Sequence, residues 1–234
     1  MRTLLIHIFF CAVLALRGQT VIGHVKKSIE RSDFSRASQI LDSCLNKKYQ
    51  EDSALFYKAM VALKTGQVKS ARKTYKKLYD AHPGYKELHY LNGLIYFSEE
   101  DYGKSISEFN LALKKDPKNA KLLYNRSLAF GMLEEYLTAI EDLGACIQMD
   151  SSYVLAYYSR AYWYEYTGNY AGAIKDYETT VRLNPSNHDA YLGLANVYKN
   201  VNEMGKACDA INRAAKEGSL IAVDLKDNFC KENR

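Results

Sequence analysis

Apolar side chains of matching size recur along the chain every 34 residues, which divides it into repeats of equal length. Positions 4, 8 and 11 of each repeat fall on one face of a helix, and positions 17, 20, 24 and 27 fall on one face of a second helix. The residues at position 20 are small in every repeat: Ala37, Ala71, Ser105, Ala139, Ala173 and Ala207. Small side chains let two helices approach closely, so the pattern predicts a helix pair, A and B, in each repeat.

Turn residues separate the predicted helices in the same register. Pairs such as Thr65-Gly66 and Gly168-Asn169 join helix A to helix B, and proline at position 32 ends helix B. The predicted repeats are a degenerate one at 20–51, followed by clear ones across 52–218: 52–85, 86–119, 120–153, 154–187 and 188–221. One helix pair cannot bury its apolar face alone, so we expect the repeats to stack.

The fifth repeat carries the fullest version of the pattern. Its residues at the recurring positions are Tyr157, Ala161, Tyr164, Gly168, Tyr170, Ala173, Tyr177 and Pro185. This pattern resembles the tetratricopeptide repeat family, strongly over 52–218 and weakly over 21–51. The resemblance implies an all-α, right-handed solenoid of about six helix pairs. The family is a general protein-holding scaffold, so the resemblance also implies that this chain holds other proteins, without naming which ones.

A last apolar segment follows the repeats at 219–234. Ile221, Leu225 and Phe229 lie four residues apart, as they would on one helical face. Repeat arrays need a terminal element that covers the last core face, so we predict a capping helix here.

The first 19 residues have the layout of a secretory signal peptide. Arg2 precedes an apolar run from Leu4 to Leu16, and polar residues resume at Arg17. The run is shorter than the roughly 20 residues that a spanning helix needs, so we expect cleavage, with a retained anchor as the alternative. Either outcome predicts an exported protein, secreted or periplasmic.

Charge is distributed unevenly along the chain, whose formal net charge is +5. Residues 24–87 hold 14 basic and 7 acidic side chains, whereas 88–234 hold 16 basic and 20 acidic ones. A basic stripe follows one predicted B helix, on the convex side of the fold: Lys69, Arg72, Lys73, Lys76 and Lys77. Such a stripe is commonly a solvated face. The alternatives are an acidic partner or peripheral contact with anionic lipids, and export disfavours nucleic acid.

Four cysteines remain after the signal peptide. Cys44 and Cys146 share position 27, three repeats apart, so they are expected to be small core residues with free thiols. Cys208 and Cys230 lie 11 residues on either side of Ser219, the predicted turn between two helices. Residues equidistant from the turn of a helix hairpin come level with each other, so these two are predicted to form a disulfide. The alternative is two unrelated thiols, one on each helix.

Aromatic residues also occupy a column of the A helices that should line a concave groove. Position 5 reads Phe56, Tyr90, Tyr124 and Tyr158, and Tyr162 stands at position 9 of the fifth repeat. Aromatic side chains give rigid contact area at low entropic cost, so we expect this ladder to project into solvent and bind a protein or peptide partner. The alternative is that the ladder only packs the scaffold.

No set of residues in the sequence suggests catalysis, a metal site or a cofactor. There is no glycine-rich phosphate loop, no CxxC pair and no combination of Ser, His and Asp at a catalytic spacing. The sequence therefore predicts a non-enzymatic interaction scaffold of the cell envelope. The alternative is an accessory subunit of a secretion or envelope-assembly machine with an obligate partner, and the oligomeric state stays open.

Overall fold

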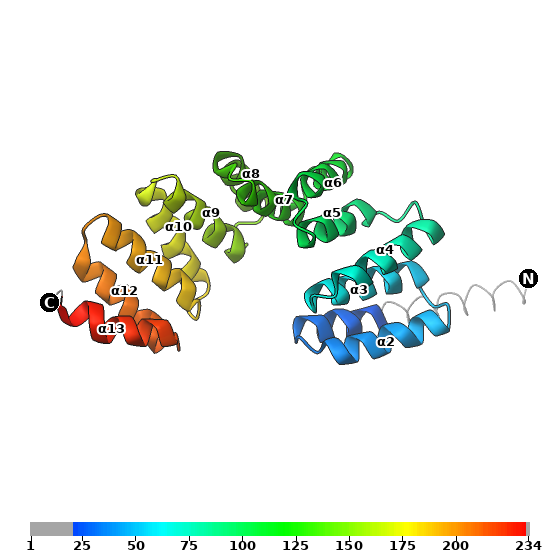
Figure 1. The fold of residues 1–234 in the computed structure, drawn as a ribbon, viewed down its shortest axis with the longest axis horizontal. Coiled ribbons are helices and arrows are strands. Elements are labelled where there is room, and N and C mark those ends of the chain that lie inside the picture. Colours follow the sequence, from blue (N-terminus) through cyan, green and yellow to red (C-terminus); the bar gives the residue numbers. More distant parts are fainter. Residues whose placement is uncertain (1–20, 233–234) are drawn as a thin grey trace, which may run out of the picture. The chain divides into compact units, whose positions relative to one another are not determined.

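The computed structural model describes residues 21–232, which are helical throughout apart from short turns and contain no strand (Figure 1). Residues 21–30 form a first helix. It is followed by α2 (Phe34–Asn46), α3 (Glu51–Lys64), α4 (Val68–Ala81), α5 (Leu88–Ser98), α6 (Tyr102–Lys115), α7 (Ala120–Met132), α8 (Tyr136–Met149), α9 (Val154–Tyr166), α10 (Tyr170–Leu183), α11 (His188–Asn200), α12 (Met204–Lys216) and α13 (Leu220–Glu232). The predicted all-α repeat fold, with six helix pairs and a final helix, is confirmed.

All six B helices begin at the same repeat position. Their first residues are Phe34, Val68, Tyr102, Tyr136, Tyr170 and Met204, each at position 17. Two residues earlier, at position 15, the backbone is left-handed in every repeat: Ser32, Gly66, Glu100, Glu134, Gly168 and Asn202 all have positive φ. Only Gly66 and Gly168 suit that conformation without steric cost. All six repeats therefore share the same turn geometry, although the type of residue at position 15 differs between them.

Small residues at positions 8 and 20 form the contact inside the helix pairs from the second repeat on, as predicted. Ala59 and Ala71 are fully buried in one repeat, and Ala161 and Ala173 are fully buried in another. In the 86–119 repeat the contact is polar, because the hydroxyl of Ser105 donates to the backbone oxygen of Gly93 at 2.9 Å. The serine hydroxyl thus finds a partner inside the core.

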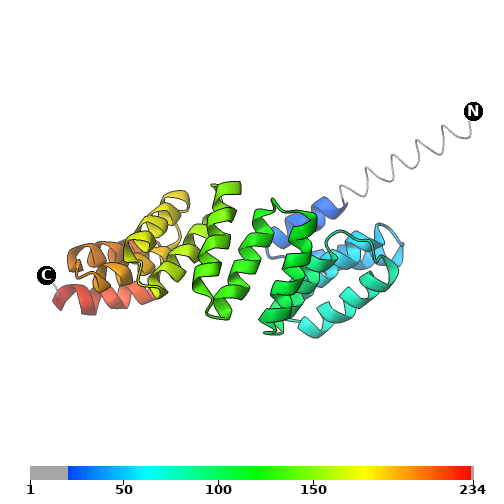
Figure 2. The same ribbon diagram turned by 90° about the horizontal axis from the view of Figure 1, so that it is seen from above.

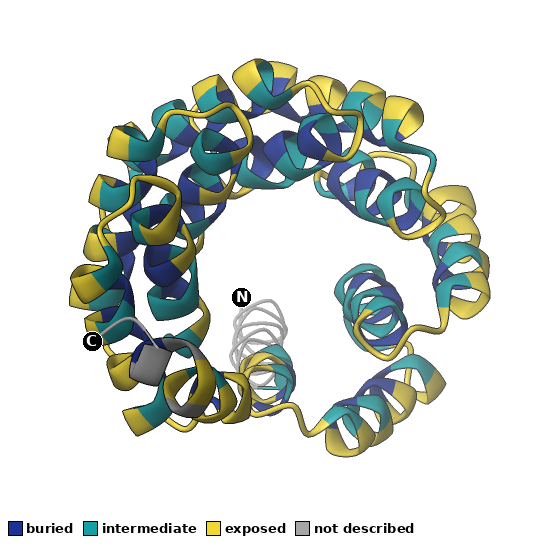
Figure 3. Cartoon of the chain, turned by 60° about the vertical axis from the view of Figure 1, so that its left-hand side comes forward, coloured by how far each residue is buried: buried dark blue, intermediate teal, exposed yellow. Residues whose placement is uncertain are grey.

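The chain divides within α6 into two compact units, unit 1 up to Glu108 and unit 2 from Phe109. In each, buried residues lie on the faces that neighbouring helices turn toward one another (Figure 3). Unit 1 has a core cluster built from its first helix, α2 and α3: Val25, Ala37, Leu41, Cys44, Ala54 and Val61. In unit 2 the helices follow one another in chain order (Figure 2).

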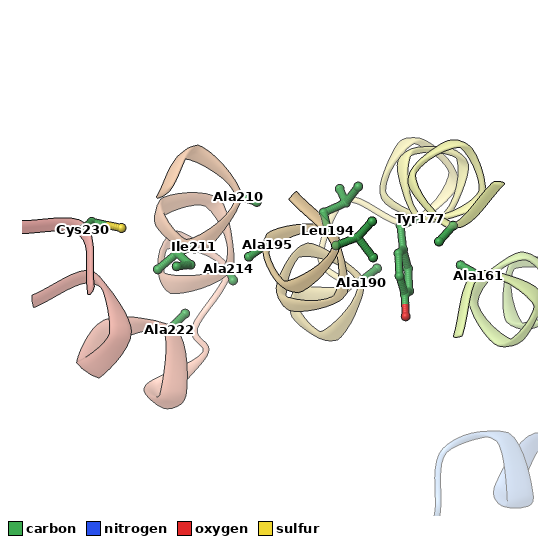
Figure 4. Close-up of a cluster of buried hydrophobic side chains, with 12 residues drawn as sticks. Ala161, Tyr177, Ala190, Leu194, Ala195, Ala210, Ile211, Ala214, Ala222 and Cys230 are labelled. Carbon is green, nitrogen blue, oxygen red and sulfur yellow. The ribbon is translucent and has the colours of Figure 1, made fainter. Parts of the chain in front are cut away.

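In the core of unit 2 the ring of Tyr177 lies between Ala161 on one side and Ala190 and Leu194 on the other (Figure 4). Tyr177 is 1% exposed, and Ala161, Ala173 and Ala190 are fully buried beside it. A Cβ on Gly193 would lie 2.4 Å from Cζ of Tyr177, so the ring needs a glycine at that position of α11. This packing joins the 154–187 repeat to the following one.

The final helix α13 packs through a different face from the predicted one. Ala222 and Cys230 are buried, whereas Ile221 is 67% exposed, so the expectation that Ile221 covers the core is wrong. The reason is register: Ala222 is the third residue of α13, as the buried Ala190 is the third residue of α11. The helix therefore resembles the A helix of a further repeat, and it leaves Leu220 85% exposed.

The predicted signal peptide, residues 1–19, lies outside the described residues. Over the part that is described, no helix has the length and apolar character needed to cross a bilayer.

Candidate partner-binding surfaces

Two members of the predicted aromatic ladder are core residues. Phe56 is 7% exposed and Tyr90 is 9% exposed, so the expectation that they project into solvent is wrong. The ring of Phe56 packs against Tyr85, the last residue of its own repeat, at a centroid distance of 5.6 Å. Burial raises the pKa of the Tyr90 phenol far above its ordinary value. In unit 1, position 5 therefore stabilises the repeat contacts and presents no aromatic surface.

The ladder members in unit 2 are more accessible. Tyr124 and Tyr158 are half-buried, and Tyr162 is 37% exposed. Tyr158 meets Tyr177 edge-on with the ring centroids 5.8 Å apart, and burial raises the pKa of its phenol. Tyr158 therefore contributes to packing as well as to surface, so truncating it is expected to cost stability. Tyr162 is the member best placed to meet a partner.

An apolar cleft opens beside this part of the ladder. It has a volume of about 240 Å³ and lies between α11, α12 and α13. Its lining residues are Leu192, Ala195, Asn196, Lys199, Ile211, Ile221 and Leu225. Leu192 continues the position 5 column, and Ile221 is the second residue of α13. Sequence reasoning assigned Ile221 to the core and so missed this cleft.

A carboxylate links the ladder to the cleft. Glu165, on α9, accepts a hydrogen bond from the side-chain amide of Asn196 on α11. Its other oxygen accepts from the hydroxyl of Tyr177 at 3.3 Å. Burial, and after it the nearby Glu165, raise the pKa of the Tyr177 phenol, so this group stays protonated and donates. These bonds tie α9 to both α10 and α11 at the edge of the cleft.

The predicted basic stripe keeps four of its five members as exposed cations. Lys69, Lys73, Lys76 and Lys77 on α4 are exposed, and no acidic group of the described chain lies within ion-pair distance of them. Arg72 is different. Its guanidinium bonds both oxygens of Glu99, at 2.5 and 3.1 Å, and donates to Asn92 at 2.6 Å. Arg72 thus joins two repeats, and the expectation that it belongs to the free stripe is wrong.

A column of polar pairs inside the repeats was missed by sequence reasoning. Position 7 on helix A and position 23 on helix B face each other in three successive repeats. The pairs are Asn92 with Glu108, Arg126 with Asp142, and Arg160 with Asp176, at 2.6 to 2.8 Å. Each pair is 16 residues apart, a spacing that the 34-residue register already contained. The polar groups of these pairs bond each other at the helix contacts, so few of their hydrogen-bonding positions remain for a ligand.

The cysteines lie as expected. Cys208 and Cys230 come to disulfide distance, with Cα atoms 5.5 Å apart, and this connects α12 to α13. Cys44 and Cys146 are buried free thiols. Burial raises the pKa of Cys146 to about 11, with Asp150 and Asp142 adding to the effect. Such thiols are inert packing groups at neutral pH.

Histidines and carboxylates do not gather into a metal site. Within residues 21–232, no group of three or more His, Cys, Asp or Glu side chains could hold a metal ion. His89, which the register places in the core, is half-exposed, and its Nδ1 lies 2.8 Å from Glu108. The candidate surfaces are therefore the cleft with its aromatic neighbours in unit 2 and the lysines of α4 in unit 1.

Comparison with known proteins places the chain among repeat proteins. A family model described as a tetratricopeptide repeat matches residues 29–86 and 56–120, and one described as a TPR repeat matches 164–202. No curated protein matches the chain in sequence. These are repeat families that generally serve as non-enzymatic, protein-binding scaffolds, and no catalytic family is indicated.

Solved structures show the same fold at low sequence identity. The crystal structure of MamA aligns with a TM-score of 0.61 and 24% identity, covering 67% of this chain and 91% of that one. TTC0263, a thermophilic TPR protein of Thermus thermophilus, aligns with a TM-score of 0.67 and 19% identity. The alignment covers 77% of this chain and 98% of that one. The Cut9–Hcn1 structure aligns with a TM-score of 0.78 and 13% identity, over 90% of this chain but 42% of that one. The chain is therefore built of tetratricopeptide repeats.

Proposed function

We propose that the protein is an exported, non-enzymatic scaffold that holds an extended segment of a partner protein on the A face of unit 2. We define the A face as the side formed by α9, α11 and α13, which carries the apolar cleft. The observation that carries the proposal is this cleft of about 240 Å³, which is lined by Leu192, the residue that follows Tyr158 in the position 5 column.

Exposed apolar side chains mark the A face as a contact surface. Leu155 on α9 is 52% exposed, and Ile221 on α13 is 67% exposed. Leu192, between them on α11, lines the cleft. Each of the three helices thus contributes one anchor, which suits a chain segment that crosses successive repeats. Contiguous apolar surface rimmed by polar groups is characteristic of protein–protein interaction sites.

Polar groups at the cleft suit a peptide. Asn196 is held by Glu165, so its amide is preorganised at the rim. Lys199 lines the same cleft and is exposed. An amide and an ammonium group can bond the carbonyl oxygens of an extended backbone, while the apolar anchors take its side chains. Preorganised side chains cost less entropy on binding than flexible ones.

Export supplies the setting of the proposal. The apolar segment at 1–19 supports a signal peptide, and the proximity of Cys208 and Cys230 suits an oxidising compartment. A secreted or periplasmic scaffold would meet its partner in the cell envelope. The narrower version of the proposal is an accessory subunit whose partner is obligate.

Photocrosslinking from the cleft tests the site. A benzophenone side chain replaces Leu192 in one variant and Tyr79, exposed on α4 of unit 1, in a matched control variant. We expect the Leu192 probe to capture one envelope protein stoichiometrically and the Tyr79 probe to leave it uncaptured. Equal capture from both positions contradicts a site on the A face.

Truncation of the anchors provides the affinity readout. Aromatic and apolar anchors near an interface centre are typically worth about 2 kcal/mol or more, so Leu155→Ala with Ile221→Ala should weaken partner binding by at least about thirtyfold. Both side chains are exposed, so the melting temperature should change little. Unchanged affinity in this variant, with loss on Lys73→Ala and Lys76→Ala, would move the site to the basic stripe of α4.

A further inference from the structure

Four aromatic rings meet at one corner of unit 2, where the turns between A and B helices lie. We call this the aromatic corner; it comprises Tyr136, at the start of α8, and Tyr162, Trp163 and Tyr166, at the end of α9. Tyr136 stacks on Trp163 at a centroid distance of 5.3 Å, and Tyr166 lies 5.4 Å from Tyr136. The hydroxyls of Tyr162 and Tyr166 are 3.1 Å apart.

The corner is both rigid and open. Trp163 is 9% exposed and is seated against α7, where a Cβ on Gly131 would lie 2.2 Å from its Cζ2 atom. Tyr162 and Tyr166, in contrast, are 37% and 58% exposed. Met132, which follows Gly131 at the end of α7, is 51% exposed. A buried indole thus supports tyrosine rings whose edges and faces reach solvent.

The surroundings of the corner are strongly acidic. Residues 127–174 contain six Asp and Glu side chains and one basic residue, Arg160, and one of the six acids, Asp142, is paired with Arg126 just outside this stretch. Arg160 is already engaged, because its guanidinium pairs with Asp176 at 2.6 Å. Glu134 and Glu135 are exposed in the turn that leads into Tyr136, and the pKa of that phenol is raised by desolvation first and by the charge of Glu134 after it. The corner therefore combines π faces with the exposed negative charges of Glu134 and Glu135.

We propose that the aromatic corner binds an arginine-bearing segment of a partner protein. A guanidinium is planar and weakly hydrated, so it stacks on tyrosine and tryptophan rings more readily than an ammonium does. The chain uses the same contact internally, where the guanidinium of Arg72 lies 4.4 Å from the ring centroid of Tyr96. Glu134 and Glu135 add attraction that brings the cation to the rings.

The corner shares Tyr162 with the aromatic ladder of α9, but it shares no residue with the lining of the cleft. The rings of the corner lie at the start of α8 and at the end of α9, whereas the cleft is lined by residues of α11, α12 and α13. The residues that the variants below replace, Tyr166, Glu134 and Glu135, do not line the cleft, so their substitution should leave binding at the cleft intact.

Trp163 makes the proposal directly measurable, because it is the only tryptophan of the chain. We would titrate the full protein with a short glycine–arginine peptide and follow tryptophan emission. A matched peptide in which citrulline replaces arginine keeps the shape and removes the charge. We expect a saturable emission change with the arginine peptide, weakened by salt, and at least about tenfold weaker binding of the citrulline peptide.

Variants separate the corner from the rest of the surface. Tyr166→Ala should weaken binding of the arginine peptide by about tenfold. Glu134→Gln with Glu135→Gln should make the affinity for this peptide less dependent on salt concentration. Tyr79→Ala removes a similarly exposed tyrosine of unit 1 and should change neither the affinity for the peptide nor its salt dependence. Circular dichroism confirms that each variant stays folded. Equal binding of the citrulline peptide, unaltered emission at saturating peptide, or full affinity in the folded Tyr166→Ala variant would each overturn the proposal.

Discussion

Arg160 and Asp176 close the α9–α10 helix pair, with Nε of the guanidinium 2.6 Å from Oδ2 of the carboxylate. A second bond, from Nη2 to Oδ1, measures 2.9 Å, so the pair is bidentate. The Asp176 side chain is 3% exposed and that of Arg160 is 20% exposed. Burial opposes the charge on Arg160, but Asp176 outweighs it and raises the pKa of the guanidinium. The preceding repeat contains the same arrangement in Arg126 and Asp142.

Removing one partner of this buried pair should destabilise unit 2. Asp176→Ala leaves the Arg160 charge without its carboxylate, and breaking buried pairs in this way typically costs about 3 kcal/mol. Urea unfolding followed by circular dichroism measures the change. Lys206→Ala, which breaks the solvent-exposed pair with Glu203, is the control and should have little effect. An equal, small effect of both substitutions would show that the buried pair adds no stability.

Glycine at the Tyr177 contact is a second point of sensitivity. Gly193→Ala places a Cβ 2.4 Å from the Tyr177 ring, so we expect about 1–3 kcal/mol of destabilisation through overpacking. At Gly205, on α12, an added Cβ would have no neighbouring heavy atom within 4 Å. Gly205→Ala should therefore stabilise the protein by up to about 1 kcal/mol, because alanine favours helix. Thermal melts of the two variants should shift in opposite directions.

The Cys208–Cys230 bridge should protect the end of unit 2. It closes a loop of 22 residues, for which the loss of chain entropy in the unfolded state gives about 3 kcal/mol. We expect mass spectrometry of non-reduced digests of exported protein to recover the linked peptides. A reducing agent should lower the melting temperature of the wild type but not of the Cys208→Ser, Cys230→Ser variant. Recovery of both cysteines as free alkylated peptides would exclude the bridge.

The buried thiols should make stability fall in alkaline solution. Burial raises the pKa of Cys146 from 9.0 to about 11, so the folded state holds this proton more tightly than the unfolded state. The resulting stability is fully present below pH 9 and is lost as the pH rises toward 11. Urea unfolding across this range should show a shallower decline in Cys146→Ala than in the wild type. Parallel declines would mean that Cys146 titrates normally.

Alkylation provides an independent check on the same thiol. At about pH 8, Cys146 and Cys44 should resist iodoacetamide in the folded protein, because burial keeps both protonated and shielded. Both should react at once in denaturant. Rapid modification of the native protein would place the thiols at the surface.

Much of this protein was determined by its sequence alone. The 34-residue recurrence placed the small contacts at Ala161 and Ala173 and located the turns. The equal spacing of Cys208 and Cys230 from the turn at Ser219 placed these two residues level with each other across one hairpin. Local periodicity suffices for these features, since a helix turns by a constant angle per residue and a stacked repeat contacts only its neighbours.

The exposure of individual side chains was decided by the tertiary structure. Position 5 is buried at Tyr90 and half-exposed at Tyr158, and Arg72 leaves the basic stripe to bind Glu99. Ile221 lines a cleft because α13 begins at Leu220 and enters the array in the register of an A helix. Helical periodicity specifies the direction of a side chain from its own helix. How far the next repeat covers it depends on the distance and angle between helices, which only packing in three dimensions determines.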